Sequence, residues 1–214
     1  MTGLFVKDFR LMRQNRQSIL IFMALALIMG LTQSNTFIMG YLPFCMAIFV
    51  TSLISYDEVD NGFQFLMTLP VSRSLYVNEK YILCMGSAII SWILSAVLYF
   101  VSKVLHGSVI NSFSDIQVVV AFLPVIVIAL SVMIPVQLKF GVEKSRIVLI
   151  CLAGSIIAAI YVVTEVLNPD TLGIILWLDS LNETGLAVAG LIFMVVAAVF
   201  SWLISRKIMM KKEF

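Results

Sequence analysis

The chain has 214 residues, of which 61% are hydrophobic and 12% charged, and its formal net charge is +2. Its mean hydropathy is +1.07, whereas an average soluble domain has about 25% charged residues. These values exclude an ordinary soluble protein and predict a membrane protein with a single transmembrane domain over residues 1–214.

Residues 1–16 are the first expected element, an interfacial amphipathic helix. At about 100° per residue, Lys7, Arg10 and Arg13 gather on one side of this helix, and apolar residues such as Phe5 and Phe9 gather on the other. Such a helix is expected to lie along the inner membrane surface. It serves either as a simple topology anchor or as a contact for a partner.

The apolar runs that follow predict membrane-spanning helices. A helix rises about 1.5 Å per residue and needs about 20 apolar residues to cross the hydrocarbon core. Uninterrupted runs favour helices over a barrel. The sequence therefore predicts an all-α, polytopic membrane protein with six transmembrane helices. In chain order the expected spans are residues 18–31, 36–55, 81–101, 116–138, 147–167 and 185–204.

Prolines lie inside two of the expected spans. Pro43 falls in the second, and Pro124 and Pro135 fall in the fourth. A proline removes a backbone donor and tends to kink a helix, so bends are expected in both spans.

The basic residues predict the orientation. With a cytoplasmic N-terminus, 13 of the 14 Lys and Arg residues fall inside and only Lys103 falls outside. The positive-inside bias explains this distribution and the inverted topology does not. We therefore expect both termini on the cytoplasmic side of the membrane. The outer loop at 168–184 is expected to hold a short re-entrant or interfacial segment.

The expected spans carry no ionisable residue near their centres. Such a group costs at least about 2.5 kcal/mol there, and proton-driven or ion-driven carriers bear that cost because the group couples transport. The only histidine, His106, falls in an outer loop, and neither HExxH nor GxxxxGK[ST] occurs. The chain is therefore predicted not to be an enzyme and to hold no cofactor or metal, and no nucleic-acid partner is expected. Energy for uphill transport would enter from another polypeptide.

A serine stripe marks the third expected span. Ser87, Ser91 and Ser95 recur every four residues and so share one helix face. Helix packing is one interpretation, because small residues allow close approach and interhelical hydrogen bonds. The other is that the stripe lines a translocation path.

The cytoplasmic loop at 56–73 combines acidic with apolar residues. Asp57, Glu58 and Asp60 are negative charges on the side where basic residues collect, so topology does not account for them. A short amphipathic helix follows, with Phe63, Leu66 and Met67 on one side. Such a helix either inserts aromatic anchors into a groove of a soluble protein or packs on the membrane or under the bundle.

The ends of this short helix have recognisable signals. Pro70 is expected to end it. Ser72 is expected to cap the helix that leads into the third span.

The loop and its flanks resemble the permease subunits of bacterial ATP-binding-cassette exporters of type 2, a small six-span family. The family pattern is an acidic pair, then (Y/F)-L-x-S-L-P-(V/I)-S-R, then a K-Y pair. The matching residues are Tyr56-Asp57-Glu58, Phe65 to Arg73, Val77 and Lys80-Tyr81, with Thr68 in place of the usual serine. Weaker matches are Lys7-Asp8 and the patch from Phe140 to Ile147.

The resemblance implies two such subunits, identical or different, docked on two cytosolic ATPase subunits that bind ATP and Mg. The loop would be the cytoplasmic coupling helix between spans 2 and 3, seated in a groove of the ATPase. The implied coupling residues are Asp57, Glu58, Asp60, Phe63, Phe65, Leu66, Leu69, Pro70 and Arg73. Glu143, Lys144 and Arg146 would make a second contact or merely anchor the topology.

The expected function is ATP-driven export of a peptide, antibiotic or other amphiphile. The alternative is a non-transporting membrane scaffold or sensor that docks a cytosolic partner through the same loop. A membrane interior without charge and the coupling-like loop favour the exporter.

Overall fold

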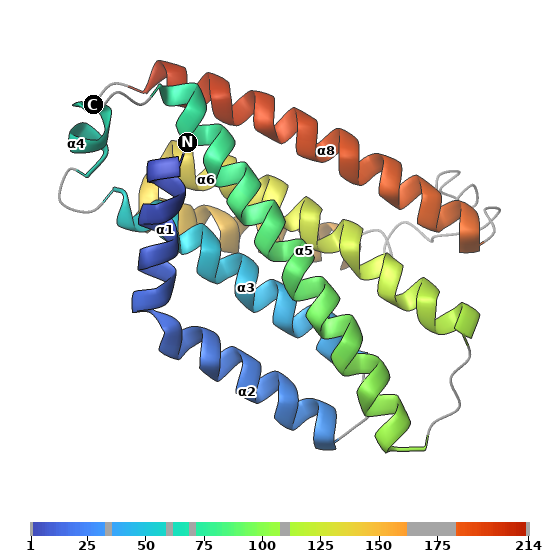
Figure 1. Ribbon diagram of the computed structural model, residues 1–214. Helices are drawn as coiled ribbons and strands as arrows, with labels where there is room; N and C mark the ends of the chain where they lie inside the picture. The colour runs from blue at the N-terminus through green and yellow to red at the C-terminus, as the bar shows by residue number, and fades with distance from the viewer. Residues whose placement is uncertain are drawn as a thin grey trace.

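The computed structural model describes residues 2–32, 36–58, 62–68, 72–107, 112–161 and 183–212. Within these ranges every regular element is an α-helix, which confirms the all-α prediction. The helices are α1 (Thr2–Gln14), α2 (Arg16–Thr32), α3 (Phe37–Tyr56), α4 (Gly62–Thr68), α5 (Arg73–Leu105), α6 (Ser112–Tyr161) and α8 (Glu183–Lys211) (Figure 1).

Within the described ranges, four helical segments are long and apolar enough to cross a membrane, or up to five if the bent pair of α1 and α2 counts as one span. The axes of that pair differ by 64°. The four segments are Phe37–Tyr56, Arg73–Leu105, Phe113–Gly141 and Val188–Lys211. They contain most of the expected second, third, fourth and sixth spans. The expected fifth span is helical as far as Tyr161, and its remainder, like the outer loop, lies outside the described residues. A total of six spans stays a prediction.

The helix α3 lies in the middle of the bundle, where it packs against α2, α5 and α6. Its residues Ile38, Leu42, Val50 and Leu53 are fully buried. The helix α8 packs along α5 and α6. The end of the bundle that carries α4 also carries α1 and the last turn of α8 (Figure 1). We call this the α4 end.

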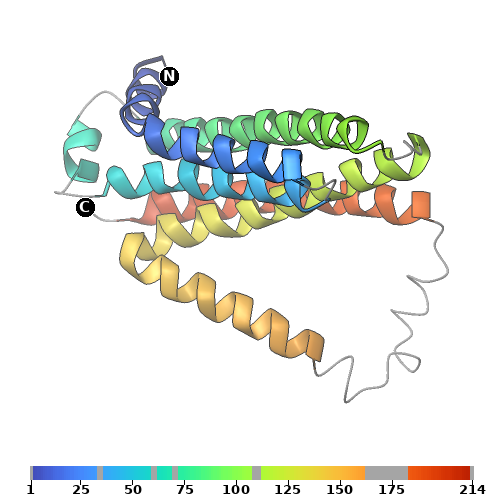
Figure 2. The same cartoon turned by 90° about the horizontal axis from the view of Figure 1, so that it is seen from below.

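The helix α6 contains a break at Gly141. The backbone there has φ 73° and ψ −175°, a region that is essentially reserved for glycine. After this residue the second part of α6 turns back and runs away from the bundle (Figure 2). The expected fourth and fifth spans leave a connecting loop at 139–146. In the structure the chain is helical on both sides of Gly141 and reverses direction at that residue. Pro43, Pro124 and Pro135 lie inside helices, so this reversal is not made by a proline.

Polar side chains join α5 to its neighbours within apolar surroundings. The Tyr81 hydroxyl lies 2.6 Å from Ser201 Oγ and 2.8 Å from Ser205 Oγ on α8. Trp202 Nε1 donates to Asn78 Oδ1 at 2.8 Å. Interhelical hydrogen bonds of this kind hold membrane helices together where lipid offers no polar partner.

The far end of the bundle has its own ion pair. Lys103, the single basic residue predicted outside, pairs with Asp115 on α6. Tyr99 also donates to Asp115 Oδ1, at 3.1 Å. Lys103 thus lies at the opposite end of α5 from α4, and the orientation in the membrane stays a prediction.

Candidate functional site

The short helix α4 has one buried and one exposed side. Phe63 is 5% exposed and Leu66 7%, because both pack into the core of the bundle. The ring of Phe63 meets the ring of Tyr76 edge to face, with 5.6 Å between centroids. Phe65 points the other way and is 71% exposed. The three apolar residues predicted to couple, Phe63, Phe65 and Leu66, therefore lie in two different environments. Phe63 and Leu66 attach α4 to the bundle, whereas Phe65 faces outward.

The connection from α4 to α5 is tied to the end of α8. Ser72 has an extended backbone, and its side chain accepts a hydrogen bond from the Leu75 amide at 3.2 Å, which confirms the predicted helix cap. Arg73 donates to the Met210 carbonyl at 2.8 Å. A cationic donor at the last carbonyls of a helix also interacts favourably with the helix dipole.

Glu58 lies against the break in α6. A Cβ atom added at Gly141 would lie 2.7 Å from Glu58 Oε2, so the carboxylate occupies the space beside that glycine. The second part of α6 begins there, and a helix N-terminus favours a nearby negative charge. Lys212 approaches the same place from the end of α8, with Nζ 3.7 Å from Glu58 Oε1.

Lys212 also connects to α4 and to the first part of α6. Its ammonium group donates to the Leu138 carbonyl at 3.2 Å. It lies 4.8 Å from the centre of the Phe63 ring. The end of α3, the α6 break, α8 and α4 therefore meet at one place.

A buried ion cluster lies beside α4 and joins α1, the end of α3 and α5. Lys80 on α5 is fully buried and pairs with Asp8 on α1 and with Asp57, whose Oδ2 lies 2.9 Å away. Lys7 pairs with the same two carboxylates, at 3.2 Å from Asp8 Oδ1. Three separate pieces of the resemblance, Lys7-Asp8, Asp57-Glu58 and Lys80-Tyr81, therefore contribute to one cluster.

Two further side chains complete this cluster. The Tyr76 hydroxyl donates to Asp57 Oδ2 at 2.9 Å. Glu79 is fully buried, with Oε2 3.9 Å from the ammonium group of Lys80. Burial alone would raise the pKa of the Asp57 carboxyl, but Lys80 and Lys7 outweigh burial and hold its pKa below the ordinary value. Asp57 is therefore a carboxylate at neutral pH.

The cluster accounts for Asp57, the first of the three acids in the loop. Asp57 is only 5% exposed, and its oxygens already face Lys7, Lys80 and Tyr76 of the same chain. Its observed contacts fix the start of the loop rather than present charge to a partner. Sequence reasoning missed Tyr76 and Glu79, and it noted Lys80 only as part of a motif. The signal that could have found this role was Lys80 itself, a charge just ahead of the third expected span.

The family comparison decides the class of this membrane protein. The family described as ABC-2 family transporter protein matches residues 3–210. The chain belongs to the ABC-2 transporter family. It is therefore a multi-pass membrane component of an ABC transporter, of the permease kind that is generally not itself the ATPase, and this implies association with an ATP-binding-cassette subunit. The comparisons with curated proteins and with solved structures found no match.

Most of the remaining residues predicted to couple the permease to its ATPase lie outside the described part of the chain. Asp60, Leu69 and Pro70 lie outside the described residues. In the predicted second contact, the side chains of Glu143 and Arg146 also lie outside that part, whereas Lys144 is exposed just after the α6 break.

The serines of the stripe on α5 lie against neighbouring helices and along a groove. All three hydroxyls donate to backbone carbonyls of their own helix, at 2.9 Å for Ser87, 3.0 Å for Ser91 and 2.8 Å for Ser95. Ser91 and Ser95 are buried, which fits the packing interpretation, while Ser87 is half-buried and lines a groove. A role in translocation stays a prediction.

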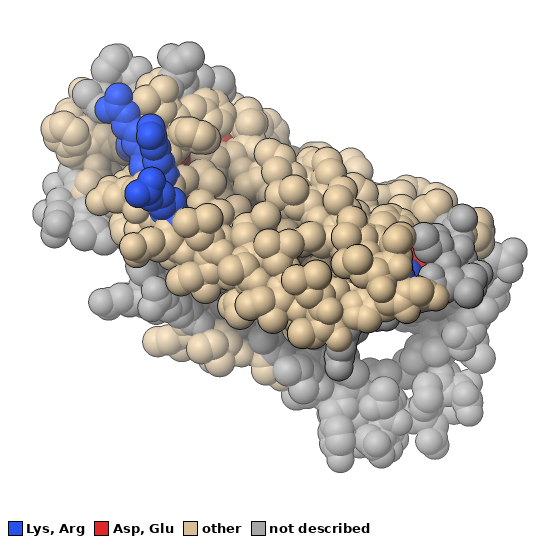
Figure 3. Space-filling view, turned by 60° about the horizontal axis from the view of Figure 1, so that its bottom comes forward, with Lys and Arg blue, Asp and Glu red and all other residues tan. Residues whose placement is uncertain are grey.

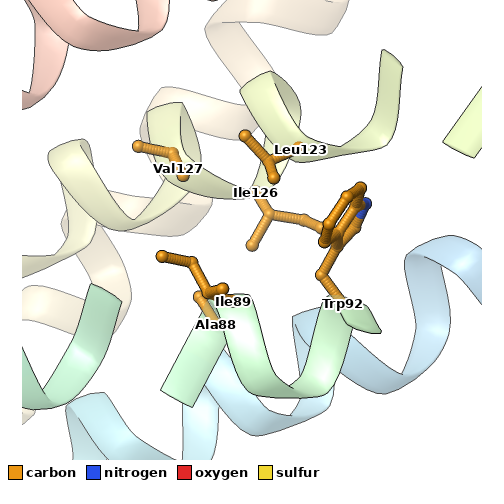
Figure 4. A pocket seen from close by; sticks show the side chains of 6 residues that line it. All are labelled: Ala88, Ile89, Trp92, Leu123, Ile126 and Val127. Atoms are coloured by element: carbon orange, nitrogen blue, oxygen red, sulfur yellow. The ribbon is translucent and has the colours of Figure 1, made fainter. Parts of the chain in front are cut away.

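A second apolar crevice between α5 and α6 does not form a ligand site. Ala88, Ile89 and Trp92 line it from α5, and Leu123, Ile126 and Val127 line it from α6 (Figure 4). It has no room for a water molecule. The Trp92 indole instead donates to the Val119 carbonyl at 2.9 Å, so the crevice is a packing contact. The described part of the permease holds no cluster of residues that could bind a metal ion.

Proposed function

We propose that the chain is the membrane-spanning subunit of an ATP-driven exporter and that it receives the motion of a cytosolic ATPase through α4. The observation that carries this proposal is the position of Phe65. Phe65 is 71% exposed, whereas Phe63 and Leu66, on the other side of the same helix, are buried in the bundle. An exposed aromatic anchor on a firmly attached support is the type of residue that dominates protein interfaces.

The attachments of α4 provide a route for the motion. Displacement of α4 acts on α5 through the ring contact between Phe63 and Tyr76. It acts on the end of α8 through Lys212, whose ammonium group lies 4.8 Å from the centre of the Phe63 ring. The adjoining Glu58 side chain abuts Gly141, where α6 reverses. Movement of a single short helix would thus reach three long helices.

In this proposal the coupling residues divide into two roles. Phe65 enters the groove of the ATPase, together with the neighbouring Asp60, Leu69 and Pro70. The second group holds α4 and its loop in place, and consists of Asp57, Glu58, Phe63, Leu66 and Arg73. Glu143, Lys144 and Arg146 form a second contact at the same end of the bundle.

The remaining parts of the proposal rest on the family and on the sequence. ATP and Mg bind in the ATPase subunits, because this sequence has no GxxxxGK[ST] pattern. Two permease subunits form the path across the bacterial inner membrane, with both termini in the cytoplasm. The cargo is a peptide, antibiotic or other amphiphile, in keeping with apolar helices that lack central charges.

Co-purification with the ATPase subunit tests the proposal. Phe65→Ala should weaken the complex by roughly 30-fold, since a central aromatic anchor contributes about 2 kcal/mol or more. Phe113→Ala is the matched control, because Phe113 is 68% exposed at the other end of the bundle. Equal ATPase recovery with both variants would contradict the assignment of α4.

ATP turnover distinguishes an exporter from a scaffold. In the complex, an exporter should change the rate of ATP hydrolysis by its partner, and Phe65→Ala should abolish that change. A partner that binds the permease with its ATP turnover unaltered would favour the non-transporting scaffold.

A further inference from the structure

A large groove lies between α1 and α5. Its volume is about 640 Å³. Phe9 and Val6 form one wall from α1, and Ile82 and Ile90 form the other from α5. These four side chains are between 51% and 70% exposed, so the groove is an open apolar surface.

The groove continues toward the middle of the bundle. A second hollow of about 250 Å³ lies between α2, α3 and α5, and it shares Met12, Ser87 and Ile90 with the first. Along α5 the two hollows extend from Ile82 to Leu94. Leu94 follows Ile82 by twelve positions, a rise of about 18 Å along the helix, which is about the depth of one membrane leaflet. We call the two hollows together the α1–α5 groove.

The α1–α5 groove is charged at one end only. Arg10 and Arg13 line it where it meets α1, whereas no charged residue lines the deeper hollow. Among the described residues, neither arginine takes part in an ion pair, unlike Lys7 of the same helix. Figure 3 shows Lys and Arg gathered in one stripe at the end where α1 lies, on a face that otherwise carries almost no charge.

We propose that the α1–α5 groove binds an anionic phospholipid of the inner leaflet. The guanidinium groups of Arg10 and Arg13 hold the phosphate, and one acyl chain lies along α5 from Ile82 toward Leu94. Positive charge at the mouth complements a phosphate, and the apolar interior complements the chain. Asp8 and Asp57 are buried and paired with Lys80, so neither carboxylate competes with a phosphate for the two arginines.

Such a lipid would fix the position of α1 relative to α5. Both helices also contribute to the buried ion cluster, through Asp8 and Lys80. The lipid site does not depend on the proposed ATPase contact, because α4 lines neither hollow.

Native mass spectrometry of the purified full chain with added lipid tests this site. The probes are phosphatidylglycerol and phosphatidylcholine, which differ in net headgroup charge. The wild-type chain should retain phosphatidylglycerol preferentially. The double variant Arg10→Gln/Arg13→Gln should bind it roughly 25-fold more weakly, since each basic residue near an anionic surface contributes about a factor of five. Lys139→Gln/Lys207→Gln removes the same charge from α6 and α8, away from the groove, and should change little.

A second variant blocks the groove without removing charge. Gly86 lines the groove, and a Cβ added there meets no atom within 4 Å, so Gly86→Leu should place its side chain in the groove. It should abolish selective binding of phosphatidylglycerol. Gly154→Leu, at another position with open space, should leave it unchanged. Circular dichroism should show equal helix content in all variants.

Three results would overturn the proposal. The first is equal retention of the two lipids by the wild-type chain. The second is phosphatidylglycerol binding that survives Gly86→Leu. The third is efficient cross-linking between two copies that carry Ile90→Cys, which would assign the groove to an interface between permease subunits.

Discussion

The ammonium group of Lys80 lies 2.9 Å from Oδ2 of Asp57, and both side chains are almost fully removed from solvent. This pair joins α5 to the residue that follows α3. Through Asp8 and Lys7 it also includes α1. The α4 loop therefore begins at a fixed point, which is the condition for a short helix to transmit force.

Lys80→Met should strongly destabilise the protein. The substitution leaves Asp8, Asp57 and Glu79 close together in a buried place, with only Lys7 to compensate them. Removal of one partner from a buried ion pair costs about 3–5 kcal/mol. The melting temperature in detergent measures the effect. Lys207→Met, at an exposed position of α8, should change the melting temperature little.

Asp57 should make the stability depend on acid pH. Its carboxyl has a folded-state pKa below the ordinary value because Lys80 and Lys7 outweigh burial. A depressed pKa stabilises the fold above the unfolded pKa, and this contribution disappears as pH falls below roughly 4 and through the folded value. Melting curves between pH 7 and pH 3 should therefore show a steeper loss for the wild type than for Asp57→Asn. Identical slopes would argue against the ionised pair.

Gly141→Ala should destabilise the reversal in α6 for two separable reasons. The backbone φ of 73° is unfavourable for alanine by about 1–3 kcal/mol, and the new Cβ would lie 2.7 Å from Glu58 Oε2. Adding Glu58→Ala removes the second cost and leaves the first. The double variant should therefore be more stable than the sum of the two single changes predicts.

Strict additivity of the two substitutions would show that Glu58 does not lie against Gly141. Gly154→Ala supplies the control for an alanine in the second part of α6, since a Cβ there meets open space.

Tyr81→Phe should weaken the attachment of α8 to α5. The hydroxyl lies within hydrogen-bond distance of Ser201 and Ser205, and Tyr81 is only 7% exposed. Interhelical hydrogen bonds in membrane proteins contribute about 0.6–1.7 kcal/mol. A small but measurable fall in melting temperature is expected. Tyr56→Phe, at an exposed tyrosine, should produce a smaller fall.

The sequence predicts the helices well because length and apolarity decide where a chain can cross a bilayer. The Ser72 cap is also predictable, since the cap contacts an amide only three residues away. The ion cluster is a different kind of feature: Asp8 and Lys80 lie 72 positions apart, and no local pattern brings them together. For the same reason, sequence alone identifies Asp57 as unusual but does not find its partners.

The α4 helix shows the same limit within seven residues. Periodicity places Phe63 and Leu66 on one side and Phe65 on another. It does not decide which side faces the bundle, because both are apolar. That choice comes from the aromatic contact with Tyr76, which belongs to the next helix.

Photo-cross-linking from α4 tests the central claim most directly. A photoreactive amino acid replaces Phe65 in one variant and Phe113 in another, and each permease is expressed in membranes together with its ATPase subunit. The account predicts a covalent adduct with the ATPase from position 65 and none from position 113. No adduct from position 65, in a complex that still assembles, would contradict it.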